Sequence, residues 1–275
     1  MTTLRKEYRI VLPVTLSEYN IAQLYTVAEM SKSESTGDTS IEILENIDFD
    51  HEIYGKCRKT IKIMNLNSKV PSVIRKVLPS KALSLEEVAY NFFPKCVTTY
   101  TNKAFSSSSF KVTVESLHID GNIYKENIFN KSIGEWKETK VEYIDISKTI
   151  VDSKYDPTVF RSEKKGIGPL VIQSRDGKDK SKNKEYKDWI EECVDKNIPL
   201  MTCYKYVTVE INYFGFGWLT KEVDRNIQKI FIGAHQKLFC DMDNWCDLTL
   251  EDIRQIEVTT KEELKKIVSE NVSSK

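Results

Sequence analysis

Short runs of alternating polar and apolar residues follow one another through the middle of the chain, with little helical sequence between them. Such runs are typical of β-strands, and turn residues such as Asp120-Gly121 separate some of them. The runs are residues 41–44, 59–66, 96–100, 110–118 and 140–146. Parallel strands need long crossover connections, usually helices, and these are mostly absent. The sequence therefore predicts a large, mainly antiparallel sheet.

Strands are also predicted nearer the two ends of the chain. Residues 7–12 form the first, and residues 201–214 form one long strand rich in Tyr, Val and Thr. A helical interruption is predicted over residues 70–77 and 84–91. The strands and this interruption belong to one domain.

The connecting segments are low in apolar residues. Residues 31–40 are interpreted as a polar loop, and residues 147–184 as a long surface connection within a single domain of residues 1–275. A short helix over residues 184–195 follows this connection. It has the inward-facing residues Tyr186, Trp189, Ile190 and Cys193.

Capping signals mark the start of two helices. Thr15 and Glu18 have capping-box spacing, as do Thr249 and Asp252 near the C-terminus. The first helix has an apolar face formed by Ile21, Leu24, Tyr25 and Ala28. Residues 221–245 predict one long amphipathic helix. A curved sheet with a long helix across it is an α+β arrangement that can enclose a cavity.

The last predicted helix places a carboxylate on its packing face. Its apolar stripe consists of Leu250, Ile253, Ile256, Thr260, Leu264 and Ile267. Glu257 lies within this stripe, where it should be paired or bind a polar ligand. On periodicity alone, the more common alternative is a glutamate at the stripe edge that reaches solvent.

Other polar residues also allow two interpretations. Thr60 and Lys62 share one face of a strand, which lines a cavity or, more commonly, faces solvent. Asn91 precedes an apolar turn and could terminate a helix. Cys96 opens a strand, and a lone cysteine is more often a core residue than a reactive one.

Composition and motifs exclude several classes of function. The formal charge is zero, from 41 basic and 41 acidic residues, which argues against a nucleic-acid-binding surface. The chain shows no GxSxG, HExxH or P-loop motif, and its three histidines are dispersed. No stretch approaches the roughly 20 apolar residues of a spanning helix. The six cysteines form no CxxC pair, which is typical of reduced thiols in a cytosolic protein.

Several segments, in order along nearly the whole chain, resemble the class I phosphatidylinositol transfer proteins. They are residues 6–14, 18–19, 23–29, 68–71, 143–146, 168–170, 204–209, 235–240 and 247–254, together with Asn91, Pro94 and Cys96. The resemblance implies a START-like helix-grip fold. In that fold a concave sheet wraps a lipid, a long helix crosses its mouth and a C-terminal helix forms a lid.

The resemblance also implies what such a chain does. Family members exchange phosphatidylinositol and phosphatidylcholine between membranes without covalent chemistry, in support of phosphoinositide supply. The phospholipid is then cargo, and no cofactor, metal or nucleic acid is expected. The implied protein is a cytoplasmic monomer that associates transiently with membranes, with a phosphoinositide kinase as a candidate partner. The expected moving parts are residues 70–85 and the helix from Thr249 onward.

Residue roles follow from the same resemblance. The residues that match the family's inositol contacts are Thr60, Lys62, Asn91 and Glu257. Those that match its phosphate and headgroup contacts are Gln23, Cys96, Thr98, Ser116 and Lys205. The family commonly has paired tryptophans that touch membranes. Here Tyr213 and Phe214 take that place, with Trp218 following, and such aromatic side chains suit an interface.

Two alternative functions remain at this point. The first is a lipid sensor that presents inositol lipid to a kinase with little bulk transfer. The second is a helix-grip hydrolase, or a carrier of another hydrophobic ligand.

Overall fold

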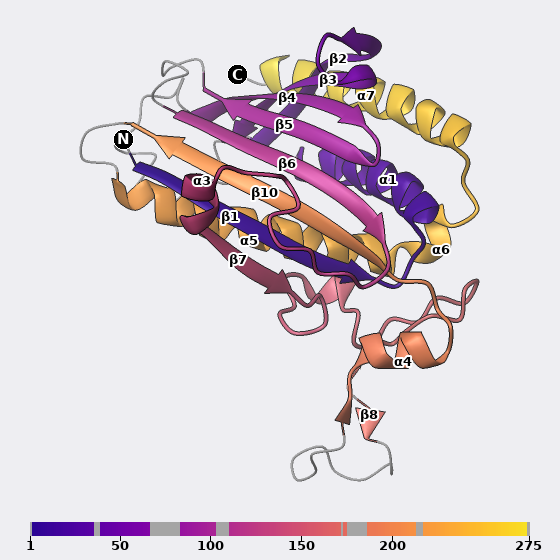
Figure 1. The fold of residues 1–275 in the computed structure, drawn as a ribbon. Helices are drawn as coiled ribbons and strands as arrows, with labels where there is room; N and C mark the ends of the chain where they lie inside the picture. Colours follow the sequence, from indigo (N-terminus) through magenta and orange to yellow (C-terminus); the bar gives the residue numbers. More distant parts are fainter. Residues whose placement is uncertain are drawn as a thin grey trace.

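The chain is organised around one large β-sheet (Figure 1), and the computed structural model describes residues 2–35, 39–66, 83–102, 110–171, 173–174, 186–212 and 217–273. The strands of this sheet are, in chain order, β1 (Thr2–Leu12), β2 (Thr39–His51), β3 (Gly55–Leu66), β4 (Ser84–Phe92), β5 (Lys95–Thr101), β6 (Phe110–Asp120), β7 (Thr139–Ile144) and β10 (Met201–Ile211). Two short strands, β8 (Gln173–Ser174) and β9 (Tyr186–Lys187), pair with each other apart from this sheet.

The strand order is β2-β3-β4-β5-β6-β10-β1-β7. Every neighbouring pair is antiparallel except β1 and β7, which run parallel. The connection from β6 to β7 contains the short helix α3 (Ile133–Lys137) and carries the chain to the far edge of the sheet. The prediction of a large, mainly antiparallel sheet in an α+β fold is confirmed.

Three long helices lie on one side of the sheet, namely α1 (Leu16–Glu34), α5 (Gly217–Cys240) and α7 (Leu250–Ser273) (Figure 1). α5 packs along β10 and β1, whereas α1 and α7 pack against each other and against β2. The shorter helical elements are η2 (Ser153–Tyr155), α4 (Trp189–Asp195) and α6 (Met242–Trp245). In the part of the chain that the structure describes, no helix is both long and apolar enough to cross a membrane.

The core lies where β1 and β10 meet α5 and α6. Tyr8, Ile10 and Phe239 are completely buried there. Trp245 is also buried, and its Nε1 donates to the Leu238 carbonyl oxygen at 2.7 Å, so its polar atom is satisfied. Burying each such side chain contributes about 1.5–3 kcal/mol. This cluster fixes α5 over β10 and β1, near the β7 edge of the sheet.

Both predicted capping boxes are present. The Thr15 hydroxyl accepts from the Glu18 amide, and the Glu18 carboxylate accepts from the Thr15 amide. Thr249 and Asp252 exchange the same two bonds at the start of α7. Each box satisfies amide groups that a helix start otherwise leaves unpaired.

The apolar face predicted for α1 is only partly right. Ala28 is buried as predicted, whereas Ile21, Leu24 and Tyr25 are only partly buried. Tyr19 and Ala22, outside the predicted face, are buried as well. α1 contacts the sheet and all three of the helices α5, α6 and α7. Because these neighbours cover more than one side of the helix, a single apolar stripe does not describe its burial.

Residues 84–91, predicted as helix, form strand β4 instead. Glu86, Glu87 and Ala89 are weak strand formers, and Glu and Ala favour helices locally. The segment nevertheless pairs with β3 on one side and β5 on the other. This pairing in the tertiary structure overrides the local preference. The other predicted helical segment, residues 70–77, lies outside the described residues.

The polar loop predicted over residues 31–40 is wrong for most of its length. α1 continues to Glu34, and β2 begins at Thr39. The hydroxyls of Ser31 and Ser35 donate to carbonyl oxygens four residues earlier, so the serine-rich sequence remains compatible with helix.

Two further element boundaries and the exposure of one connection differ from the predictions. The helix predicted over residues 221–245 is two helices, because the chain turns at Asp241 between α5 and α6. The connection over residues 147–184 is not wholly on the surface, since Ser162 and Leu170 are buried. The helix predicted from residue 184 begins later: α4 starts at Trp189, preceded by β9.

Candidate functional site

A row of directly paired residues crosses five neighbouring strands of the sheet. From β3 to β10 it consists of Arg58, Asn91, Cys96, Ser116 and Lys205, each opposite the next. Residues opposite each other on neighbouring strands have their side chains on the same face. The last four residues of the row, all predicted site residues, therefore share one face.

Three more predicted residues belong to the same face. Alternate residues of a strand point the same way, so Thr60 and Lys62 on β3 and Thr98 on β5 lie beside the row. The face is the one that the helices cover, because Lys205 Nζ lies 5.1 Å from the ring centre of Phe231 on α5. Seven predicted residues from five strands are thus brought together.

Glu257 reaches this face from α7. On β2, opposite Thr60, Asn46 donates from its Nδ2 to Glu257 Oε2 at 3.0 Å. Arg254 Nη1 lies 2.9 and 2.8 Å from the two carboxylate oxygens, and Arg58 Nη2 lies 3.8 Å from Oε2. The Glu257 side chain is only 14% exposed. It is therefore a paired carboxylate on the packing face and not one that reaches into solvent.

Thr60 and Lys62 are likewise not on a solvated face. Lys62 is 8% exposed, and its Nζ lies 3.5 Å from Glu87 Oε1 on β4. Thr60 Oγ1 donates to Asn46 Oδ1 at 3.3 Å. A buried ammonium needs a charged or hydrogen-bonded partner, which Glu87 supplies. Thr60 is thus linked through Asn46 to Glu257 on α7, while Lys62 is held by Glu87 on β4.

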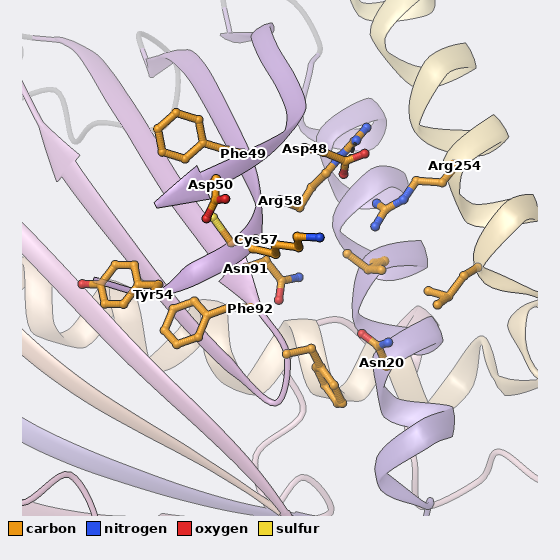
Figure 2. A pocket seen from close by; sticks show the side chains of 14 residues that line it. Asn20, Asp48, Phe49, Asp50, Tyr54, Cys57, Arg58, Asn91, Phe92 and Arg254 are labelled. Atoms are coloured by element: carbon orange, nitrogen blue, oxygen red, sulfur yellow. Dashed lines mark hydrogen bonds and ion pairs between the residues drawn. The ribbon is translucent and has the colours of Figure 1, made fainter. Parts of the chain in front are cut away.

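Asn91 lines a pocket of about 830 Å³ formed by the β2–β3 hairpin, the β4–β5 turn and the N-terminal halves of α1 and α7 (Figure 2). Its lining residues are Asn20, Leu24, Asp48, Phe49, Asp50, Tyr54, Lys56, Cys57, Arg58, Asn91, Phe92, Phe93, Leu250 and Arg254. Asn91 Oδ1 is buried and has no hydrogen-bond partner among the described residues. Such an atom is expected to accept from a bound group.

Lys205 is the cation at the β10 end of the row. Its Nζ donates to Ser116 Oγ at 3.3 Å, and no carboxylate of the described residues forms an ion pair with it. Nearby, Cys96 Sγ lies 3.7 Å from Thr98 Oγ1. Burial raises the pKa of the Cys96 thiol, so this sulfur stays protonated at neutral pH. Together these groups offer one positive charge and several weak donors, which suits a phosphate-like anion.

Gln23 occupies a different position from the other predicted headgroup residues. It lies on α1, and its Nε2 donates to Asn20 Oδ1 at 3.4 Å. This bond connects it to a residue that lines the pocket rather than to the strand row.

The predicted membrane-docking residues cannot be placed with the site. Tyr213 and Phe214 lie outside the described residues. For Trp218 only the backbone is described, in the first turn of α5.

Two buried histidines lie near Lys205 as well. His235 Nδ1 bonds to the Phe231 carbonyl oxygen at 2.7 Å, and its Nε2 bonds to Tyr19 Oη at 3.3 Å. Burial, with Lys205 as a smaller cause, lowers the pKa of His235 to about 3. The same two causes hold the pKa of His118 well below its usual range. Both imidazoles are therefore neutral at physiological pH.

Three residues of the site were missed at the sequence level, namely Asn46, Arg58 and Arg254. Arg58 stands two residues before Thr60, and Arg254 stands three before Glu257, so strand and helix periodicity could have indicated them. Asn46 gave no such signal, because the strand predicted over residues 41–44 ends before it.

Comparisons with known proteins match nearly the whole chain. The family model described as phosphatidylinositol transfer protein matches residues 3–262. Phosphatidylinositol transfer protein 1 of Dictyostelium discoideum is 38% identical over 279 residues, covering 98% of this chain and 97% of its own. Phosphatidylinositol transfer protein 2 of that organism is 39% identical over 272 residues, covering 97% of each chain.

A mammalian relative is similar over nearly the same length. The human phosphatidylinositol transfer protein beta isoform is 35% identical over 270 residues, covering 94% of this chain and 92% of its own. The family match contains every predicted site residue, from Gln23 to Glu257.

Proposed function

The chain belongs to the phosphatidylinositol transfer protein family, and we propose that it binds one phospholipid between the sheet and its covering helices and exchanges it between membranes. The proposed cargoes are phosphatidylinositol and phosphatidylcholine, in support of phosphoinositide supply. The observation that carries this proposal is the row of Asn91, Cys96, Ser116 and Lys205 on the helix-covered face.

The inositol ring is assigned to Thr60, Lys62, Asn91 and Glu257. This ring offers several hydroxyls, each of which donates and accepts hydrogen bonds. Lys62 can only donate and ionised Glu257 can only accept, so the two distinguish ring hydroxyls by role. Choline carries a quaternary ammonium with no hydrogen-bonding group. Loss of one of these four residues should therefore weaken inositol-lipid binding more than choline-lipid binding.

The phosphodiester, which both lipids share, is assigned to the row around Lys205. Lys205 supplies the positive charge, and Ser116, Thr98 and Cys96 supply hydroxyl and thiol groups beside it. Gln23 is proposed to approach from α1. These groups bind and orient the phosphate, and no bond of the lipid is made or broken, so we propose a carrier and not an enzyme.

The acyl chains set the shape that such a carrier needs. Two chains carry roughly 30 methylenes, and removing each from water is worth about 0.8 kcal/mol, so complete burial is worth on the order of 25 kcal/mol. A surface groove that left half of the acyl-chain surface exposed to water could not carry the lipid between membranes. We therefore propose a START-like helix-grip cavity that is closed in transit by α5 and the lid helix α7.

Opening at a membrane is proposed to involve α7 and residues 70–85, most of which lie outside the described residues. Docking is assigned to Tyr213, Phe214 and Trp218, since such aromatic side chains suit a membrane interface. The proposed working form is a cytoplasmic, single-domain monomer that contacts membranes transiently. It requires no cofactor or metal, because lipid exchange is a binding equilibrium.

Two measurements test this function. Mass spectrometry of lipid that co-purifies with the protein should recover phosphatidylinositol and phosphatidylcholine, and recovery of only sterol or ceramide would refute the headgroup assignment. Exchange of both labelled lipids between donor and acceptor vesicles should be measurable. Retained binding without exchange would instead support a sensor that presents inositol lipid to a kinase.

Variants of the inositol site give the first specific prediction. Thr60→Ala or Glu257→Ala should abolish inositol-lipid transfer and leave choline-lipid transfer. Of the two headgroups, only inositol has hydroxyls that can bond to these side chains. Glu263→Ala is the matched control, since this glutamate lies on the same helix with its side chain 49% exposed. Equal loss of both lipids in the Thr60 and Glu257 variants would show that these residues serve the fold.

A further inference from the structure

The side-chain amide of Asn46 connects two strands of the sheet to the lid helix. Its Nδ2 donates to Glu257 Oε2 on α7 at 3.0 Å. Its Oδ1 accepts from Arg58 Nε at 2.8 Å and from Thr60 Oγ1 at 3.3 Å, both on β3. Two of the residues proposed to hold inositol, Thr60 and Glu257, are thus bonded to opposite ends of one amide.

The orientation of this amide follows from the chemistry of its neighbours. Arg58 Nε can only donate, so the amide oxygen must face it. Glu257 is paired with Arg254 and is ionised, so it can only accept, and the amide nitrogen must face it. Reversing the amide would place donor against donor and acceptor against acceptor. Asn46 is therefore held in one orientation by charged groups on both sides.

This orientation fixes what Thr60 offers to a ligand. Because the Thr60 hydroxyl proton is donated to Asn46 Oδ1, its remaining lone pairs point elsewhere and can accept. Beside it Lys62 can only donate. A bound hydroxyl can therefore donate to Thr60 while another accepts from Lys62.

The same network limits what Glu257 can accept. An ionised carboxylate has about four acceptor positions. Arg254 contacts both oxygens and Asn46 contacts Oε2, while Arg58 Nη2 lies 3.8 Å from Oε2. The free capacity is therefore mainly at Oε1, which suits a single hydroxyl donor. The side chain is held in place before any ligand arrives, so little orientation is lost on binding.

We propose that Asn46 is a positioning residue that sets the preference for the inositol headgroup by orienting Thr60 and Glu257. This inference rests on the proposed function and adds to it a residue that does not itself need to touch the lipid. Because the choline headgroup has no hydroxyl to bind, the network affects the choice between cargoes and not the capacity to carry lipid.

The variant Asn46→Asp tests this inference with almost no change in shape. Its carboxylate can still accept from Arg58 and Thr60, but the donor to Glu257 is replaced by a like charge. Inositol-lipid transfer between vesicles should fall by about tenfold or more, since a lost bond to a charged group is worth that much. Choline-lipid transfer should be nearly unchanged.

Combining Asn46→Asp with Glu257→Gln provides a rescue that a purely structural role would not predict. The glutamine amide can donate to the new carboxylate while its carbonyl oxygen remains available as an acceptor. Inositol-lipid transfer should then recover in part relative to Asn46→Asp alone. A double variant no better than the single one contradicts the inference.

Asn65→Ala is the matched control. Asn65 also bridges β2 and β3, through a bond from its Nδ2 to Ser40 Oγ at 3.0 Å, but it is of opposite parity to Thr60 along β3 and so points to the other face. This variant should leave the ratio of inositol-lipid to choline-lipid transfer unchanged. A shift in that ratio as large as that of Asn46→Asp would attribute the effect to the hairpin as a whole.

The failures of the inference and of the function can be told apart. If Thr60→Ala selectively loses inositol lipid but Asn46→Asp loses both lipids equally or neither, the inference is wrong and the function stands. If the unaltered protein exchanges neither lipid, the proposed function itself is wrong.

Discussion

Substitution of Lys205 should reduce the transfer of both proposed lipids to the same extent. Both lipids carry the same phosphodiester, and a lysine and a phosphate at contact attract each other by up to about 4 kcal/mol at an effective dielectric near 20. Lys205→Met keeps the length of the side chain and its packing on Phe231 but removes the charge. Transfer of inositol and choline lipid should each fall by tenfold or more in the vesicle assay.

The matched control for this variant is Lys131→Met. Lys131 Nζ also lies over an aromatic ring, 4.5 Å from the ring centre of Tyr206, and pairs with Glu115. Tyr206 follows Lys205 along β10 and therefore points to the opposite face of the sheet. Normal transfer is expected for this control. Selective loss of inositol lipid in Lys205→Met would contradict the assignment of Lys205 to the shared phosphate.

At the scale of the residue, the family resemblance predicts the site residues, whereas hydrophobic periodicity indicates them only weakly. Periodicity placed Glu257 on a packing face, but the same pattern fits a glutamate that reaches solvent. The pairing of Glu257 with Asn46 joins positions 211 residues apart and depends on how α7 is placed over β2. No local spacing predicts such a contact, which is why Asn46 was missed.

The start of α7 offers a test at the scale of the element. Thr249 and Asp252 satisfy each other's amides, and the helix then buries Ile253 and Leu264. Thr249→Ala removes the cap and should lower the free energy of unfolding by about 0.5–2 kcal/mol. Chemical denaturation monitored by circular dichroism measures this change.

Thr259→Ala is the control for the cap. Thr259 lies exposed on the same helix, and its hydroxyl bonds only to the Gln255 carbonyl oxygen one turn earlier. Its replacement should leave stability nearly unchanged or raise it by a few tenths of a kcal/mol, because alanine is a better helix former than threonine. A loss as large as that of Thr249→Ala would show that threonine content, and not the cap, stabilises α7.

Elements with strong local signals were predicted well, and those that depend on neighbours were not. The capping boxes of α1 and α7 involve residues three apart, so the sequence contains the whole interaction. β4 has glutamates and an alanine that favour helix, and it becomes a strand because β3 and β5 both pair with it. The pairing of β4 with these two strands cannot be deduced from the sequence of residues 84–92 alone.

Across the whole molecule, the sheet and helix content could be predicted, but the strand order could not. β10 lies between β6 and β1, and β7 joins the far side of β1 in parallel. This order brings Lys205 opposite Ser116 and so completes the polar row. The same folding buries two neutral histidines, His118 on β6 and His235 on α5.

These histidines make the stability of the whole fold depend on pH. Folding lowers the pKa of His235 to about 3 and also lowers that of His118. Below the ordinary histidine pKa near 6.5, these two histidines are protonated in the unfolded chain but stay neutral in the folded protein. The contribution of these groups is therefore complete above that pH. It should be lost as pH falls, by up to about 1.4 kcal/mol per pH unit for each histidine.

The variant His235→Gln isolates this effect from general acid denaturation. Glutamine can replace the bond to Phe231 but binds no proton, so the fall in the free energy of unfolding between about pH 6.5 and 4.5 should become shallower. The carboxylates whose pKa folding lowers, such as Glu142 and Asp243, lose their contribution only at lower pH. An unchanged slope in His235→Gln would show that the buried imidazole does not titrate on unfolding.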